Sequence, residues 1–335
     1  MKIFVTGSTG LLGSNLVRSL HDHGHQVSAL VRSPEKARAL LGSRARLVEG
    51  DMTAVSRFAP ALAGCDALMH AAAYYSEHYQ NGKHTDRAGL VNVKGTATLL
   101  EAAVRHGIRN IVYISSSGVL ESQQERPIDE QSPYDETTRD AYFKSKIDAE
   151  KLVLRFAETH PDVRIVLLLP TVMLGPMDSA PTPTGKFIQG FLAGRVKLLL
   201  PGSMHIVDAR DVVELAIRCI HKGEPCGRYL VGGRHTTIEE LLGTLAELTG
   251  RPPLTKRISP RKLFLVAHVL SALGKLTGKA PPLEPNIVKR LQQDFHYDST
   301  RAQQTLGAQF RPLRETLADT VAWFEHSTGV RGDQA

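Results

Sequence analysis

A tyrosine and a lysine four residues apart could together move a proton. Tyr142 and Lys146 lie in the segment AYFKSKIDAEKL, which reads as helical, so their side chains share one helix face. A free tyrosine, with a pKa of about 10, is a poor acid–base group at neutral pH. A nearby ammonium favours the phenolate and lowers that pKa. The pair is therefore a candidate for proton transfer to or from a substrate oxygen.

Serines at the end of a preceding strand complete this candidate site. The run ISSS, Ile114–Ser117, ends a strand predicted over Asn110–Ser116, and we expect Ser116 to hold the substrate oxygen. Ser117 takes that role if the true alignment is shifted by one residue from the predicted one. The YxxxK spacing alone is common by chance. Its significance lies in the order along the chain, where a glycine loop, strand-end serines and YxxxK follow one another.

Three glycines lie directly after the first predicted strand. Lys2–Thr6 runs into GSTGLLG, so that Gly7, Gly10 and Gly13 fall between this strand and a helix predicted over Gly10–His23. The first glycine permits a tight turn, the second lets backbone amides approach a pyrophosphate, and the third lets helix and strand pack closely. The phosphates would meet the positive end of the helix dipole. This arrangement predicts dinucleotide binding.

The end of the second predicted strand, Val27–Arg32, indicates which dinucleotide binds. An NAD site usually places an acid there for the ribose 2′-hydroxyl. This sequence has Arg32, whose guanidinium can bind a 2′-phosphate at two points, with Ser33 and Lys36 nearby. We therefore favour NADP(H), with NAD(H) as the alternative. Asp51, at the end of the third strand, is expected to meet the adenine amine.

The elements between these motifs predict an α/β fold. Apolar strand-like runs alternate with amphipathic helices in the first half, which is typical of a parallel sheet covered on both faces. We expect a Rossmann-type doubly wound sheet with a smaller, interleaved C-terminal lobe for the substrate. Residues 1–175 would form the dinucleotide-binding part, with 205–233 returning to it, and residues 176–204 and 234–330 would form the lobe.

Seven segments are predicted as strands and eleven as helices. The strands are Lys2–Thr6, Val27–Arg32, Arg46–Asp51, Ala67–Ala72, Asn110–Ser116, Arg164–Pro170 and Arg228–Gly232. The helices are Gly10–His23, Pro34–Leu41, Val55–Ala63, Arg87–His106, Arg139–His160, Gly185–Gly194, Ala209–His221, Ile238–Leu248, Pro260–Leu276, Glu284–Asp294 and Leu313–His326.

Bulk properties exclude several other classes of protein. The three cysteines lack CxxC spacing, which fits a reducing cytoplasm, and we expect no metal site. His21, His23 and His25 straddle a helix end and read as solvated. The net charge is +7, but no basic stripe interleaved with aromatics is present, so we expect no nucleic-acid partner. The longest apolar stretch, Leu263–Leu273, is shorter than the about 20 residues that span a bilayer.

The segment Arg261–Lys279 is apolar on much of its surface and basic at both ends. We interpret it as a helix that packs on the core of the lobe. Contact with lipid is the alternative, because a basic amphipathic helix can lie in a membrane interface.

The motifs together resemble those of the extended short-chain dehydrogenase/reductase family, in its NAD-dependent epimerase/dehydratase-like group. The resemblance covers nearly the whole chain and is greatest to the dihydroflavonol-reductase-like and hydroxysteroid-dehydrogenase-like branches. The matching runs are TGSTGLLG, HAAA at His70–Ala73, VNVKGT at Val91–Thr96, YISSSGVL, PIDEQSP at Pro127–Pro133, YFKSK, LLPTVMLGP at Leu168–Pro176 and HIVDARDV at His205–Val212.

This resemblance implies a role for each residue of the site. Tyr142 would exchange a proton with the substrate oxygen, Lys146 would bind the nicotinamide ribose and tune Tyr142, and Ser116 would hydrogen-bond that oxygen. Asn92 stands where the family often supports the lysine through water, and Pro170 would fix the face of the nicotinamide. The further cofactor contacts expected are Thr9, Leu11, Leu12, Met52, Ala71 and Ala72.

Departures from the family pattern bear on the substrate. Leu169 and Val172 replace the arginine and asparagine of RPxNxxG, and Met204 replaces an arginine that holds a nucleotide phosphate in nucleotide-sugar members. A sugar nucleotide is therefore disfavoured, and an apolar carbonyl compound or alcohol fits better. The expected substrate contacts are Tyr74, Tyr75, Ser117 and Val172.

These inferences favour an NADP(H)-dependent reductase or dehydrogenase that acts on a ketone, aldehyde or secondary alcohol in the cytoplasm. The alternative is an NAD-dependent sugar epimerase or dehydratase that oxidises its substrate transiently. A regulator without turnover is a third reading, against which the intact Ser-Tyr-Lys set argues. The family pattern also implies a homodimer through the helices Arg87–His106 and Arg139–His160. Their outer faces would carry Leu90, Leu99, Leu100, Ile147 and Leu152, which could equally face the sheet.

Overall fold

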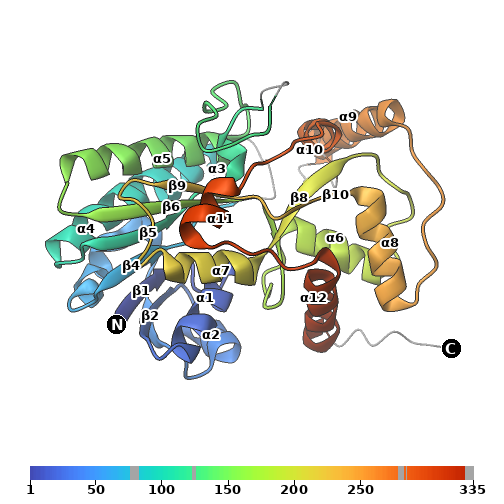
Figure 1. Cartoon of the computed structure of the whole chain (residues 1–335). Helices are drawn as coiled ribbons and strands as arrows, with labels where there is room; N and C mark the ends of the chain where they lie inside the picture. The colour runs from blue at the N-terminus through green and yellow to red at the C-terminus, as the bar shows by residue number, and fades with distance from the viewer. Residues whose placement is uncertain (76–82, 123–125, 278–282, 284, 329–335) are drawn as a thin grey trace.

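Seven short apolar strands form one parallel sheet at the centre of the larger part of the molecule (Figure 1). The computed structural model describes residues 1–75, 83–122, 126–277, 283 and 285–328. The strand order is β3-β2-β1-β4-β5-β6-β9, and every pairing is parallel, which confirms the predicted doubly wound sheet. The strands are β1 (Lys2–Thr6), β2 (Gln26–Val31), β3 (Arg46–Glu49), β4 (Ala67–His70), β5 (Asn110–Ile114), β6 (Arg164–Pro170) and β9 (Arg228–Val231).

Alternate side chains of each strand pack into two separate cores, one on each face of the sheet. In β1, Ile3 and Val5 point into the first core, and Phe4 points into the second. All three are fully buried, as a parallel sheet covered on both faces requires. The first core is covered by α1 (Leu11–Asp22), α2 (Pro34–Leu41) and α7 (Ala209–Arg218), and the second by α4 (Thr96–Arg105) and α5 (Ala141–Thr159).

A smaller lobe contains a second sheet that the sequence did not indicate. Its three strands, in the order β10-β8-β7, do not alternate regularly between apolar and polar residues. Residues 205–208 belong to this sheet, whereas α7 and β9 return to the large one, as predicted for Arg228–Gly232. The lobe consists of β7 (Val172–Leu174), β8 (Ser203–Asp208), β10 (Arg234–Thr237), α6 (Pro183–Leu192), α8 (Ile238–Thr249) and α12 (Leu313–Thr328), which share a third core.

Three further helices complete the C-terminal part of the chain. They are α9 (Pro260–Thr277), α10 (Pro285–Gln292) and α11 (Thr300–Leu306). Figure 1 shows α9 and α10 together at the outer edge of the lobe, and α11 contacts β9 of the large sheet. Residues 278–279 of the predicted basic segment and residues 329–330 of the predicted lobe lie outside the described residues. Within the described ones, no helix is both long and apolar enough to cross a bilayer.

Two helix predictions differ from the structure. The segment Val55–Ala63 falls on two 3₁₀ turns, η1 (Met52–Arg57) and η2 (Ala59–Leu62), because Pro60 has no amide hydrogen for the α-helical bond to the Ser56 carbonyl. The segment Arg87–His106 is divided into α3 (Lys83–Ala88), the π-helical stretch η3 (Gly89–Gly95) and α4. Gly95 lies in this irregular stretch, and a Cβ there would come within 2.6 Å of the Met52 carbonyl oxygen.

The helices expected at a dimer interface mostly face the sheet. Leu99, Leu100 and Ile147 are buried in the second core. Leu90 is 47% exposed and Leu152 is half-buried, so of the five residues expected at the interface these two keep apolar surface available to a partner.

Candidate active site

Several residues that the sequence predicts to be functional lie at the carboxyl ends of the strands of the large sheet. Gly7 follows β1, Ala71 follows β4, Ser116 follows β5, and Pro170 ends β6. These are carboxyl ends of neighbouring parallel strands. The chain leaves β1 and β4 in opposite directions along the sheet, and the crevice at such a switch point is where ligands bind in this class of fold.

The glycine loop is held by close backbone contacts. Gly7 has a φ of +73°, and a Cβ there would lie 2.7 Å from the Ala71 carbonyl carbon and the Ala72 nitrogen. Gly10 N donates to Gly7 O at 3.0 Å. A Cβ on Gly13 would overlap the Gly7 carbonyl group, so only glycine allows α1 to start this close to β1. The steric roles expected of the first and third glycines are therefore present.

The first turn of α1 presents uncapped amides to this crevice. Gly10 is the N-cap and supplies no side-chain acceptor, and no acidic residue lies in the first turn. A helix start of this kind attracts an anion. The side chains of Leu11 and Leu12 are buried, so these residues offer backbone amides to a ligand. Thr9, half-buried, precedes them in the loop.

Arg32 and Asp51 lie beyond neighbouring strands, β2 and β3. Arg32 is exposed, and the Asp51 Oδ1 atom accepts hydrogen bonds from Thr53 N (2.9 Å) and Thr53 Oγ1 (2.7 Å). Partial burial acts to raise the pKa of Asp51, but the Thr53 bonds and the charges of Arg32 and Arg87 outweigh it and lower the pKa. A cation and a carboxylate that interact electrostatically therefore lie beyond the ends of β2 and β3.

A buried histidine fixes the loop that faces the glycines. Thr96 Oγ1 donates to the Asn92 carbonyl (2.6 Å), so it accepts from His70 Nε2 (2.9 Å). The other ring nitrogen, Nδ1, then accepts from Thr6 Oγ1 (2.6 Å), which in turn accepts from Ala72 N (3.2 Å). Burial lowers the pKa of His70 to about 3, which keeps the ring neutral. The sequence marks His70 only as part of the HAAA run, because its two hydrogen-bond partners come from distant segments.

The three strand-end serines have different surroundings. The buried Ser115 donates its hydroxyl to the Glu150 carboxylate. Ser117 is buried at the start of the 3₁₀ turn η4 (Ser117–Val119). Ser116 is half-buried, and its Oγ accepts from Gly118 N at 3.2 Å, so its hydroxyl proton can be donated to a ligand oxygen. Of the three, Ser116 is the best placed to bind a substrate.

Tyr142 is fixed in the first turn of α5. Asp140 caps the helix by accepting from Tyr142 N (2.9 Å) and Phe143 N (3.3 Å). The Phe143 ring lies directly on Gly118, where a Cβ would overlap it, so the loop after β5 is pressed against the start of α5. The edge of the Tyr75 ring contacts Tyr142, with a centroid distance of 4.6 Å. Ser116 and Tyr142 are thereby held on two packed segments.

Lys146 is buried one turn after Tyr142. Its Nζ donates to the Ile114 carbonyl (2.7 Å) and to Tyr113 Oη (3.3 Å). Burial lowers the pKa of Lys146 to about 8, against an opposing effect of Glu150. The pKa of Tyr142 is raised by burial, then by Tyr75 and Asp140. The expected lowering of the Tyr142 pKa is therefore not found, because Lys146 is held against the end of β5.

Asn92, in η3, links the loop after β4 to the catalytic helix. Its Oδ1 accepts from Tyr74 N (2.6 Å), and its Nδ2 donates to Tyr74 O (3.1 Å) and Ser145 Oγ (2.9 Å). Ser145 immediately precedes Lys146 and donates to the Tyr142 carbonyl (2.7 Å). The Tyr74 ring also lies under the Arg87 guanidinium, 5.4 Å from it. Asn92 therefore positions both the tyrosine loop and α5.

A buried carboxylate behind the site was not recognised in the sequence. Glu150, on α5, is fully buried, and its Oε1 lies 2.8 Å from Arg228 Nε and accepts from Tyr134 Oη at 3.1 Å. Its Oε2 accepts from Ser115. This network joins α5, the end of β5 and β9, and the sequence offers no local signal for it.

Histidines of the smaller lobe border the far side of the site. His205, on β8, donates from Nδ1 to Gly232 O (3.2 Å), a carbonyl that also accepts from Thr171 Oγ1 (2.8 Å) next to Pro170. Burial and nearby His235 lower the pKa of His205 to about 4. His235 Nε2 in turn lies 2.7 Å from Asp294 Oδ1.

Val172, on β7, lies near His205, because Val172 pairs in register with Ile206 on β8 and Ile206 follows His205. Val172 itself is half-buried. Met52, by contrast, is buried at the start of η1, and Pro170 is buried in the sheet.

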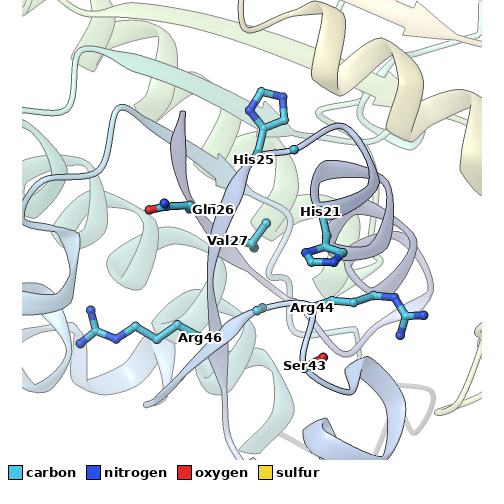
Figure 2. A pocket seen from close by; sticks show the side chains of 9 residues that line it. His21, His25, Gln26, Val27, Ser43, Arg44 and Arg46 are labelled. Carbon is cyan, nitrogen blue, oxygen red and sulfur yellow. The ribbon is translucent and has the colours of Figure 1, made fainter.

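A depression elsewhere on the surface does not belong to this site. Figure 2 shows it between His21, His25 and the arginines Arg44 and Arg46, with a volume of about 440 Å³. It is lined by Gln26 and by other residues at the amino ends of β2 and β3. Those ends lie at the opposite edge of the sheet from the glycine loop.

Comparison with known proteins agrees with this geometry. The chain matches the NAD dependent epimerase/dehydratase family over residues 3–232. It is 34% identical to sterol demethylase protein B of Methylococcus capsulatus (97% of this chain, 98% of the relative) and 32% identical to a putative dihydroflavonol 4-reductase of Synechocystis (98% and 96%). The solved structure of gox2253 has a TM-score of 0.83 at 30% identity (97% and 98%). The chain therefore belongs to the NAD-dependent epimerase/dehydratase family and is an NAD(P)-dependent oxidoreductase.

Proposed function

We propose that the chain is an NADP(H)-dependent reductase or dehydrogenase acting on an apolar ketone, aldehyde or secondary alcohol. The observation that carries this proposal is the packing of the Ser116 loop against the first turn of α5, which holds Tyr142 beside the carboxyl edge of the sheet. Ser116, Tyr142 and Lys146 are the proposed catalytic residues.

The residues at the sheet edge fit a dinucleotide. A Cβ on Gly7 or Gly13 would occupy backbone space, and the uncapped start of α1 suits a pyrophosphate. Arg32 would bind the 2′-phosphate, and Asp51 would accept from the adenine amine. The remaining proposed contacts are Thr9, Gly10, Leu11, Leu12, Met52, Ala71, Ala72, Asn92, Tyr142, Lys146 and Pro170.

Ser116, Tyr142 and Lys146 then have different parts in the proposed reaction. The bound dinucleotide supplies or accepts a hydride. In the reductive direction Ser116 donates a hydrogen bond to the carbonyl oxygen, and Tyr142 gives that oxygen its proton. The raised pKa of Tyr142 keeps its hydroxyl protonated at neutral pH, so the residue carries the proton that it would give to the substrate. Lys146, held by Ile114 O, is placed to meet the ribose.

The proposed substrate is apolar. Leu169 and Met204 stand where the family's nucleotide-sugar enzymes have arginines, and the relatives include a sterol demethylase protein and a putative dihydroflavonol 4-reductase. The proposed contacts are Tyr74, Tyr75, Ser117 and Val172. A screen of carbonyl compounds for stoichiometric NADPH oxidation tests this proposal. An epimerase would instead regenerate its cofactor, and turnover of a sugar nucleotide without net NADPH consumption would contradict the proposal.

The cofactor preference depends on Arg32. We expect Arg32→Asp to weaken NADPH binding by about 1.5–3 kcal/mol, the value of a hydrogen bond to a charged group, and to leave NADH binding unchanged or improved. Fluorescence titration with both cofactors measures this. Arg38→Asp, on the exposed surface of α2, is the matched control and should change neither affinity. Wild-type protein that binds NADH as tightly as NADPH would refute the preference.

We also propose a homodimer through α4 and α5, in a cytoplasmic enzyme whose three cysteines are all unpaired. Leu90 and Leu152 are the apolar residues left for the interface. Sedimentation velocity at micromolar concentration should show a dimer, and Leu90→Glu should shift it toward monomer. A wild-type monomer would argue against this interface.

A further inference from the structure

Helix α9 contacts the rest of the protein along a narrow stripe. Leu263 and Ala267 are buried against Val288 of α10, with Leu200 and Ile258 beside them. The buried residues of this small cluster are distinct from those of the main core of the lobe, and Leu200 packs against both. The helix therefore packs on the protein with one side. The interpretation of Arg261–Lys279 as a helix that packs on the core of the lobe holds for this side only.

The opposite side of α9 is apolar and exposed. Leu265 is 65% exposed and Leu276 is 84% exposed. Six of the ten exposed large apolar side chains found in the described part of the chain lie on this one helix: Phe264, Leu265, Val266, Val269, Leu273 and Leu276. At about 100° of rotation per residue, all but Phe264 fall within an arc of about 100°, on the side away from Leu263 and Ala267. Such a contiguous face indicates an interaction surface.

The charge of the chain is concentrated around this helix. Between Leu248 and Leu283 the sequence has seven basic residues and no acidic one. The rest of the chain carries 34 basic and 34 acidic side chains, so this one segment accounts for the entire net charge of +7. Arg261 and Lys262 are exposed at the start of α9, and Lys256 is exposed just before it.

We propose that α9 docks the protein on an anionic lipid bilayer, lying flat in the interface with its exposed apolar face in the acyl region. The basic residues of its flanks would pair with lipid phosphates. The apolar run is too short to cross the bilayer, which agrees with the absence of a spanning helix among the described residues.

The charge pattern argues against a second copy of the chain as the partner. In a two-fold symmetric dimer the same patch meets itself, so two antiparallel α9 helices would place Arg261 and Lys262 against the other end of the segment. That end carries Lys275, and the sequence of α9 contains no acidic residue. The interface would bring cations together, whereas an anionic bilayer neutralises them.

Co-sedimentation of the full chain with vesicles tests the proposal. We expect binding to phosphatidylcholine vesicles that contain about one-third phosphatidylglycerol, weakened by salt, and little binding to phosphatidylcholine alone. Arg261→Gln with Lys262→Gln should weaken binding about thirtyfold, at one factor of about five per cation. Leu265→Glu should weaken it at least about tenfold, because a charge would enter the acyl region.

Matched substitutions on exposed positions elsewhere control for surface effects. Arg18→Gln on α1 and Arg38→Gln on α2, both exposed and outside α9 and the proposed dimer helices, should leave vesicle binding unchanged. Thermal melting followed by circular dichroism verifies that each variant is folded. Absence of wild-type binding to anionic vesicles, or equal binding by the α9 variants, would overturn the proposal. A Leu265→Glu variant that dissociates a dimer without any vesicle binding by the wild type would assign the face to a second copy.

Discussion

We expect Tyr142→Phe to lower turnover by about 10²–10⁴-fold, the usual effect of losing a general acid–base group. The substitution removes one oxygen. The ring contact with Tyr75 and the cap on the Tyr142 backbone amide do not involve that oxygen, so folding and dinucleotide affinity should stay nearly unchanged. Steady-state kinetics with NADPH and a carbonyl substrate, a NADPH titration and a thermal melt measure the three quantities.

Tyr134→Phe is the matched control for this loss of a hydroxyl group. Tyr134 is half-buried and donates its hydroxyl to Glu150, behind the site, so its removal should affect stability and leave turnover close to wild type. Lys146→Ala should reduce both turnover and cofactor affinity, because Lys146 is proposed to contact the ribose. A Tyr142→Phe enzyme with wild-type turnover would rule out the proposed mechanism.

The second large effect concerns stability. We expect Glu150→Ala to lower the free energy of unfolding by about 3–5 kcal/mol, because it leaves the charge of Arg228 largely buried without an anion. The side chain of Arg228 is 17% exposed and that of Glu150 is fully buried. Tyr134 and Ser115 also lose their acceptor. Urea denaturation measures the change.

Glu136→Ala provides the control, because Glu136 pairs with Lys151 at the surface. An exposed pair contributes at most about 1 kcal/mol, so this variant should stay near wild type. If Glu150→Ala costs no more than Glu136→Ala, the buried network does not stabilise the fold in the way described.

The sequence predicts those features that depend on local backbone constraints. Gly7 and Gly13 are required by contacts within and next to one strand–turn–helix unit, and β1, α2 and β6 have the predicted bounds. Several predicted strands continue past the structural ends, because apolar residues such as Ala71 line the crevice after the sheet hydrogen bonds stop. Periodicity alone does not separate these two environments.

Features that depend on distant segments were not predictable. The partner of Glu150 comes from β9, and the contacts of Lys146 are with Tyr113 and Ile114, so the direction of its ammonium is set by another strand. Periodicity likewise identifies α9 as an apolar helix, but which of its faces is covered depends on α10. The π-helical turn around Asn92 has no signal in residue propensity.

The late position of β9 in the chain has a consequence for synthesis on the ribosome. This strand pairs with β6 through residues 228–231, after β7, α6, β8 and α7 have been made. Until then β6, with the sequence RIVLLLP, has an unpaired apolar edge, which favours pairing with other chains. A nascent chain or proteolytic fragment that ends near residue 175 should therefore aggregate, even though it contains the whole glycine loop and the Ser-Tyr-Lys set.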